Sequence, residues 1–181
     1  GTGKIAENFY QANRFINGFE LTAVYSRTME KAREFGFRKG NLAYFDNLEE
    51  FAGSDAFDAV YLASPNCCHH DQAIAMMRAG KHVICEKPLA SNYEEAKEMF
   101  AVAEEEGVIL MEGMRSIYTP GFQKMTEYME TLGTIRRATI QYCQYSSRYD
   151  NFKRGIIENA FNPELSNGAL MDIGVYTVAC M

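Results

Sequence analysis

Short apolar runs alternate with longer segments of helical periodicity over residues 1–112. The apolar runs are rich in β-branched and aromatic side chains, and this alternation is typical of a parallel sheet covered by helices. The pattern predicts an α/β domain with strands at Leu21–Tyr25, Ala43–Phe45, Ala59–Ala63, His82–Cys85 and Ile109–Glu112. It predicts helices near Ile5–Asn17, Met29–Phe37, His70–Ala79 and Tyr93–Glu106. Gly80 and Gly107 stand where helices would end in a left-handed residue, and Ser91 with Glu94 forms a capping-box pattern.

The pattern changes after residue 112. A helix is predicted near Gly121–Leu132, and Arg136–Tyr145 alternates as a long strand would. The polar stretch Ser146–Asn167 is expected to be mostly loop, and a last helix begins near Gly168. We therefore expect a first domain over residues 1–114 and the beginning of a second over residues 115–181. One long strand without sheet partners makes this second domain incomplete in the sequence.

Composition and charge narrow the class of protein. Hydrophobic residues make up 47% of the 181 residues and charged residues 23%, as in soluble globular proteins rather than disordered or collagen-like chains. The longest apolar runs fall far below the roughly 18 residues that a membrane-spanning helix needs. The net charge of −6 argues against a general nucleic-acid binder, which would present a basic face. Neither nucleic acid nor a membrane is expected as a partner.

The cysteines indicate a reducing compartment. The chain has 5 of them, an odd number with irregular spacing, which favours reduced thiols and a cytoplasmic location over a disulfide framework. The chain opens at Gly1, inside what looks like a motif, so an upstream export signal stays an open alternative.

The chain begins with a glycine-rich sequence of the form G-x-G-x-x-A. Its residues are Gly1, Thr2, Gly3, Lys4, Ile5 and Ala6. Such glycines allow a tight turn and let backbone amides approach a pyrophosphate at a helix N-terminus. The next predicted strand is followed by Ser26 and Arg27, with no carboxylate for the ribose hydroxyls. A guanidinium and a hydroxyl can bind the 2′-phosphate of NADP, which favours NADP over NAD; a solvated turn arginine is an equally open alternative.

The third predicted strand runs into Ser64, Pro65 and Asn66, followed by two cysteines and two histidines. Adjacent side chains cannot all point at one tetrahedral centre, which disfavours a zinc site. Open α/β sheets bind ligands at the carboxyl ends of their parallel strands. We therefore interpret this turn as part of a ligand site, with an ordinary β–α turn as the alternative.

A charged pair, Glu86 and Lys87, directly follows the apolar strand His82–Cys85, and Pro88 fixes the chain direction beyond it. Charges at the end of a buried strand are unusual for packing. A lysine there could orient a substrate hydroxyl and favour loss of a proton from a neighbouring donor. The alternative is a surface ion pair.

Together, the sequences G-T-G-K-I-A, S-P-N-x-x-H and A-G-K-H-V-I-C-E-K-P-L-A resemble the Gfo/Idh/MocA oxidoreductases. The resemblance implies a Rossmann-type dinucleotide-binding domain followed by an α+β substrate domain with a large, mostly antiparallel sheet. It also implies a longer parent chain that forms a homodimer or higher homo-oligomer. Beyond the glycine motif, it implies cofactor contacts from Ser64, Pro65, Asn66, His69, Glu86 and Lys87, beside those expected from Ser26 and Arg27. Arg115 stands where family members often carry a tryptophan, and we expect it to contact the cofactor or the substrate.

The same resemblance implies that the segment Gly168–Tyr176 lines the substrate pocket. Asp172 and Tyr176 are four residues apart, so they share a helix face. The resemblance implies that Tyr176 is the general acid/base, that Lys87 assists it and holds the substrate oxygen, and that Asp172 orients the substrate or the tyrosine. Two alternatives remain: a cofactor-binding regulator without turnover, and a homologue in which Tyr176 only packs. The presence of both Lys87 and Tyr176 favours the enzyme.

The expected activity is NADP-dependent transfer of a hydride to or from a carbon that bears a hydroxyl or carbonyl group. The resemblance implies a small-molecule substrate such as a sugar, a cyclic polyol or a trans-dihydrodiol.

Overall fold

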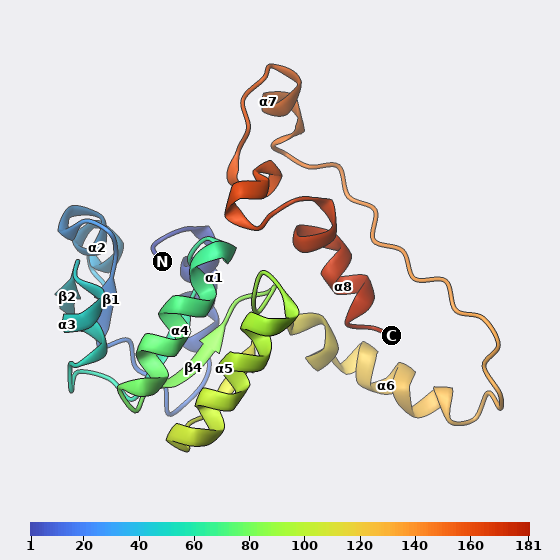
Figure 1. Ribbon diagram of the computed structural model, residues 1–181, viewed down its shortest axis with the longest axis horizontal. Helices are drawn as coiled ribbons and strands as arrows, with labels where there is room; N and C mark the ends of the chain where they lie inside the picture. Colours follow the sequence, from blue (N-terminus) through green and yellow to red (C-terminus); the bar gives the residue numbers. More distant parts are fainter.

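A computed structural model describes residues 1–181 (Figure 1). The five strands predicted in residues 1–112 all form, and every strand pairing is parallel. The strands make two sheets instead of one, because no strand pairs with both β1 and β3 to connect them. In the first sheet β1 (Ala23–Tyr25) pairs with β2 (Ala43–Phe45). In the second, β4 (His82–Cys85) lies between β3 (Ala59–Leu62) and β5 (Leu110–Glu112).

Five helices accompany these strands. The predicted ones are α1 (Lys4–Asn13), α2 (Met29–Gly36), α4 (His69–Arg78) and α5 (Tyr93–Glu106), and α1 ends earlier than expected. The sequence analysis missed α3 (Leu48–Ala52), which is too short to show a helical period. It forms because the Asn47 side chain accepts hydrogen bonds from the amides of Glu49 (2.8 Å) and Glu50 (3.1 Å).

The main core lies between β4 and the two helices α4 and α5. Met76, Met77, Met99 and Val83 are completely buried there. Full burial of such a side chain contributes about 1.5–3 kcal/mol relative to exposure. Phe51 of α3 joins the two sheets, because its ring packs against Tyr25 of the first sheet and belongs to the core of the second. Within the second sheet, the carboxyl ends of β3, β4 and β5 lie at one edge because the three strands are parallel.

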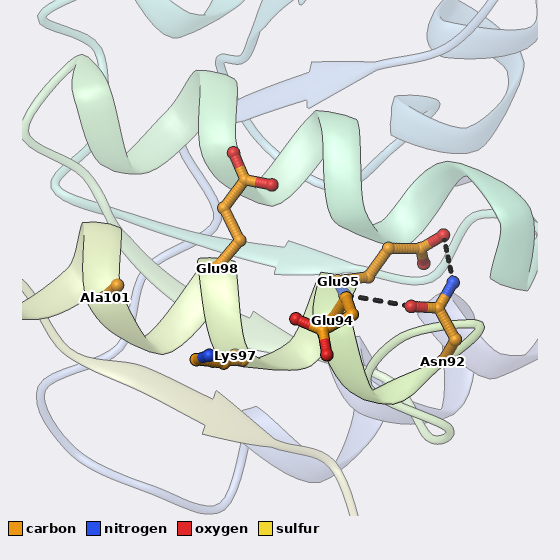
Figure 2. Close-up of a pocket in the computed structure, with 6 residues that line it drawn as sticks. All are labelled: Asn92, Glu94, Glu95, Lys97, Glu98 and Ala101. Atoms are coloured by element: carbon orange, nitrogen blue, oxygen red, sulfur yellow. Dashed lines mark hydrogen bonds between the residues drawn. The ribbon is translucent and has the colours of Figure 1, made fainter.

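The glycines predicted at helix ends adopt the left-handed conformation, with φ of 75° at Gly80 and 65° at Gly107. The predicted cap of α5 is wrong by one residue. Figure 2 shows that Asn92 is the capping residue, because its side-chain oxygen accepts the amide N–H of Glu95 (3.0 Å) and its NH₂ group donates to the Glu95 carboxylate (2.8 Å). The other Glu95 oxygen accepts the amide N–H of Ser91 (2.9 Å), which completes the box one residue later than Ser91 and Glu94.

The second part of the chain is open and mostly irregular. Helix α6 (Pro120–Met129) forms as predicted, but the strand predicted at Arg136–Tyr145 does not. Figure 1 shows this segment running as an extended chain along one side of the molecule. A lone strand leaves its backbone groups unpaired, and without neighbouring strands an alternating pattern cannot make a sheet.

The chain then returns towards the α/β part. The segment predicted as mostly loop contains the short helix α7 (Tyr149–Lys153) and two 3-10 turns. The last helix is a π-helical turn, Leu170–Gly174, that continues into α8 (Val175–Val178). No helix combines the length and the apolar character needed to cross a membrane.

A titratable link between α4 and α5 gives a prediction about stability and pH. The His70 ring lies 2.8 Å from the Asp71 carboxylate and 3.1 Å from that of Glu98. Partial burial disfavours the imidazolium, but the two carboxylates outweigh it and raise the pKa of His70. The stabilisation is therefore complete below the unfolded-state pKa of about 6.5 and is lost as pH rises through the folded-state pKa.

We expect His70→Gln to lower the free energy of unfolding by about 0.2–1 kcal/mol at pH 5.5, and by less at pH 8.5, because Glu98 is an exposed partner. Urea denaturation of both proteins at the two pH values measures this difference. A loss of the same size at both values would exclude the ionic contribution.

Candidate active site

The turn that carries Glu86–Pro88 follows β4 directly and is held by the end of β5. The Glu112 carboxylate accepts the amide N–H of Leu89 (2.9 Å), and the Gly113 N–H donates to the carbonyl of Cys85 (2.6 Å). A Cβ atom on Gly113 would lie 3.3 Å from the Cys85 carbonyl oxygen and from the Glu86 Cα atom, so a glycine lets the two strand ends approach closely. The backbone of Lys87 is therefore tightly positioned.

His69 connects this turn to the one after β3. Its ring is completely buried, with Nδ1 2.8 Å from the Pro88 carbonyl oxygen and Nε2 3.1 Å from that of Ser64. Burial lowers the pKa of His69, against the two carbonyl contacts that favour the imidazolium. Both ring nitrogens face backbone carbonyls inside the protein, and in the neutral ring one of them donates a hydrogen bond. The geometry therefore favours a role in positioning the two turns over the direct cofactor contact expected from the sequence.

Glu86 has a partner that the sequence analysis missed. The Tyr61 hydroxyl on β3 donates a hydrogen bond to one Glu86 oxygen, and the other accepts the amide N–H of Lys87 (3.2 Å). Burial, followed by the hydrogen bond to this carboxylate, raises the pKa of Tyr61 far above its usual range. The Tyr61 ring also stacks on Phe9 of α1, with 3.7 Å between ring centroids. A tyrosine in an apolar strand carries no sequence signal that distinguishes this role from packing.

Lys87 meets the C-terminal segment of the chain. Its ammonium group donates to the backbone carbonyl of Asp172 (2.7 Å) and to Oδ1 of the same residue (3.2 Å). The two side chains are 14% and 35% exposed, so the ion pair is mostly shielded from water. The same ammonium nitrogen lies 4.8 Å from the centroid of the Tyr176 ring. The structure thus brings together Lys87, Asp172 and Tyr176, the three residues predicted to be catalytic.

Tyr176 has a second aromatic neighbour, which the sequence analysis also missed. The Tyr142 ring stacks on it with centroids 5.3 Å apart and planes inclined by 15°. Tyr142 belongs to the extended segment that was predicted as a strand, and its hydroxyl donates only to Gln144 (3.1 Å). The phenol ring of Tyr176 is therefore contacted by a cation and by an aromatic ring from different parts of the chain.

The residues predicted to contact the cofactor lie at the ends of β1, β3, β4 and β5 and at the start of α1. Ser26 is buried and its amide donates to the Phe45 carbonyl (3.1 Å), while Arg27 is exposed. The side-chain NH₂ group of Asn66 donates to the backbone carbonyl of Ser166 (2.9 Å) and to the side-chain oxygen of Asn167 (2.8 Å). Pro65 immediately precedes the 3-10 turn Asn66–Cys68, and Arg115 is exposed in the turn Arg115–Tyr118.

A shallow polar depression elsewhere does not coincide with these residues. Figure 2 shows it on the outer face of α5, lined by Asn92, Glu94, Glu95, Lys97, Glu98 and Ala101. None of the predicted site residues takes part in it.

Comparison with known proteins decides the family. Residues 1–114 match the model of the Gfo/Idh/MocA family, described as an oxidoreductase family with an NAD-binding Rossmann fold. The chain belongs to the Gfo/Idh/MocA oxidoreductases. The resemblance read from its three motifs is confirmed, and so is the Rossmann-type α/β fold.

Several relatives of this Gfo/Idh/MocA chain have names that specify a reaction. It is 51% identical over 178 residues to the NADP(+)-dependent scyllo-inositol 2-dehydrogenase of Bacillus subtilis, covering 98% of this chain and 54% of that protein. It is 28% identical over 178 residues to the trans-1,2-dihydrobenzene-1,2-diol dehydrogenase of Xenopus tropicalis, covering 97% of this chain and 52% of that protein.

Among solved structures, a 3-ketoreductase from Actinomadura kijaniata in complex with NADP and TDP-benzene has a TM-score of 0.67 and 31% identity. The match covers 72% of this chain and 40% of that one. The chain thus spans about half the length of the curated relatives it matches.

The Gfo/Idh/MocA chain has groups suited to a nicotinamide dinucleotide. Gly3 is the N-cap residue of α1 and has no capping side chain, which leaves the first amides of the helix free to bind a phosphate. The Ser64 hydroxyl is buried without a hydrogen-bond partner, beside Gly1 at the end of β3. A buried polar group without a partner is costly, and a ligand hydroxyl or phosphate would satisfy it. These residues fit the cofactor that the family binds.

Proposed function

We propose that the full-length parent is an NADP-dependent oxidoreductase that transfers a hydride between the nicotinamide and a CH–OH or C=O carbon of a sugar, a cyclic polyol or a trans-dihydrodiol. The convergence of Lys87, Asp172 and Tyr176 at the carboxyl end of β4 carries the proposal. The named relatives act on substrates of these kinds. Solved structures of the ketoreductase include one lysine-to-alanine and one tyrosine-to-phenylalanine variant.

Each residue of the site has a proposed role. The cofactor, when bound, accepts or supplies the hydride at C4 of the nicotinamide. During oxidation, Tyr176 in its phenolate form takes the proton of the substrate hydroxyl, and during reduction the Tyr176 phenol gives its proton to the carbonyl oxygen. The Lys87 ammonium holds that substrate oxygen and stabilises negative charge on it. Asp172 holds the ammonium in place through two hydrogen bonds.

The cofactor contacts follow the geometry at the strand ends. We assign the pyrophosphate to the amides of Gly1–Ile5 at the start of α1, and the 2′-phosphate to Ser26 and Arg27. We assign the remaining cofactor contacts to Ser64, Pro65, Asn66, Glu86 and Arg115. The boundary between residues 114 and 115, a homodimeric state and a cytoplasmic location are further parts of the proposal for the parent protein.

The proposal is tested by following nicotinamide absorbance with the full-length parent, NADP⁺ or NAD⁺, and a panel of inositols, aldoses and trans-diols. Reduction of NADP⁺ with one class of substrate supports the proposal and names that class. Tight binding of NADP⁺ with no turnover of any member in either direction would contradict it and support the regulator instead.

Arg27 is expected to set the preference for NADP⁺. We expect Arg27→Ala to raise KM for NADP⁺ about 10- to 100-fold, because a charge-assisted hydrogen bond contributes roughly 1.5–3 kcal/mol. KM for NAD⁺ should change little, since NAD⁺ has no 2′-phosphate. Arg33→Ala on the exposed face of α2 is the matched control. Equal effects of Arg27→Ala on both cofactors would exclude this role.

A further inference from the structure

Two adjacent cysteines at the end of β3 have no part in the proposed reaction. Cys67 and Cys68 lie in the 3-10 turn Asn66–Cys68, with Cys67 exposed and Cys68 half-buried. Neighbouring residues of a helix usually point apart, yet these two sulfur atoms are only 3.8 Å from each other. The turn therefore presents a pair of thiols that one ligand atom can reach from the solvent.

The geometry disfavours a disulfide between these thiols. Consecutive Cα atoms are about 3.8 Å apart across a trans peptide, whereas disulfides usually join Cα atoms about 4.4–6.8 Å apart. Burial and then the Cys67 thiol raise the pKa of Cys68, which disfavours the thiolate that thiol–disulfide exchange requires. The pair is thus expected to persist as a dithiol.

A single thiophilic atom fits between the two sulfur atoms. With bonds of about 2.3 Å to each sulfur, one atom can bridge sulfur atoms that are up to about 4.6 Å apart, so the separation of 3.8 Å lets a single atom bind both. The following histidines do not join them, because His69 is bound to two backbone carbonyls and His70 to the carboxylates of Asp71 and Glu98. The site therefore offers two sulfur ligands, which suits soft ions and metalloids that need no third protein ligand.

The dithiol lies next to the proposed cofactor site. Asn66, the first residue of the same turn, is assigned to the cofactor. We propose that Cys67 and Cys68 form a capture site for trivalent thiophilic metalloids, and that filling this site excludes NADP, because the two cysteines share a turn with Asn66. The second part rests on the proposed function, whereas capture itself does not.

The capture reaction balances without an oxidant or a reductant. An arsenoxide of the form R–As=O exchanges its oxygen for the two sulfur atoms: two S–H bonds break, two As–S bonds form, and the oxygen leaves as water with both protons. Arsenic stays trivalent. A dithiol reagent reverses the reaction, because its two thiols replace both cysteine sulfur atoms on the arsenic and close a smaller chelate ring, while the cysteines regain their two protons.

The experiment uses the reduced full-length parent and phenylarsine oxide as the probe, with adducts counted by intact mass. We expect an adduct at this pair that ethanedithiol removes and a monothiol does not. Cys67→Ser and Cys68→Ser should each weaken binding by about 100-fold or more, since the chelate advantage of two linked contacts is of that order. Cys143→Ser, at an exposed cysteine elsewhere, is the matched control and should bind as the wild type does.

The two parts of the proposal have separate readouts. If wild type and both single variants bind the probe equally, or if the wild type binds none, the capture site is overturned. If capture depends on both cysteines, saturating NADP⁺ should slow adduct formation at least 10-fold. An unchanged rate in a protein that binds NADP⁺ overturns the overlap with the cofactor. A protein that does not bind NADP⁺ at all contradicts the proposed function and the overlap with it, and leaves the capture result standing.

Discussion

Replacing Tyr176 with Phe is expected to lower kcat by about 10²- to 10⁴-fold, the range that general acid–base catalysis contributes. The substitution removes the hydroxyl and keeps the ring. The contacts of the ring with the Lys87 ammonium, 4.8 Å from its centroid, and with Tyr142, at 5.3 Å, can therefore persist. Affinity for NADP⁺ should stay within about 2-fold of the wild type, a change of about 0.4 kcal/mol, because the Tyr176 hydroxyl is assigned to the substrate and not to the cofactor. Steady-state kinetics and a fluorescence titration of the cofactor measure the two quantities.

Tyr142→Phe is the matched control for this prediction. It removes a phenol hydroxyl from the neighbouring stacked ring, where the only hydrogen bond lost is the one to Gln144. We expect near wild-type kcat from this variant. Wild-type turnover by Tyr176→Phe would instead show that Tyr176 is a packing residue. The proposed mechanism would then have no general acid/base for the proton transfer.

The second large effect is expected from Lys87→Met. The substitution keeps an unbranched chain of similar length but removes the ammonium that would hold the substrate oxygen. Loss of one such donor typically costs about 10²- to 10³-fold in kcat. Two acceptors on Asp172 also lose their donor, and because that side chain is 35% exposed, water can replace the lost hydrogen bonds. We therefore expect a loss of stability of only about 1 kcal/mol.

Two further variants separate the effect of Lys87→Met on stability from its effect on kcat. Lys81→Met removes a lysine just before the opposite end of β4, where its ammonium lies over the Phe57 ring, and it should leave kcat unchanged. Asp172→Asn keeps the backbone carbonyl that Lys87 also binds, so it should lower kcat less than Lys87→Met does. If Lys87→Met lost stability but kept wild-type kcat, Lys87 would be a structural ion-pair partner only.

Local sequence patterns account for most of the secondary structure. The bounds of β2, β4 and α5 agree with the prediction. Each element is a short apolar run or a segment of helical periodicity, and the residues next to it in the sequence mark where it ends. Gly80 and Gly107 likewise mark the helix ends where left-handed residues occur. The strand expected at Arg136–Tyr145 fails for the converse reason: a strand needs partners, and alternation along one segment says nothing about whether they are present.

Some features of the candidate site could be predicted from the sequence, whereas others depend on the tertiary structure. The residue types and spacings in the sequence determined the family and the Glu86–Pro88 turn at the end of a buried strand. The family resemblance then indicated Tyr176 as the candidate acid/base. Only the tertiary structure decided that Lys87 binds Asp172, which lies 85 positions further along the chain, and that His69 joins two turns through their carbonyls. Hydrophobic periodicity and helix-capping residues reflect interactions between residues a few positions apart. These contacts instead depend on which strand ends meet at one edge of the sheet.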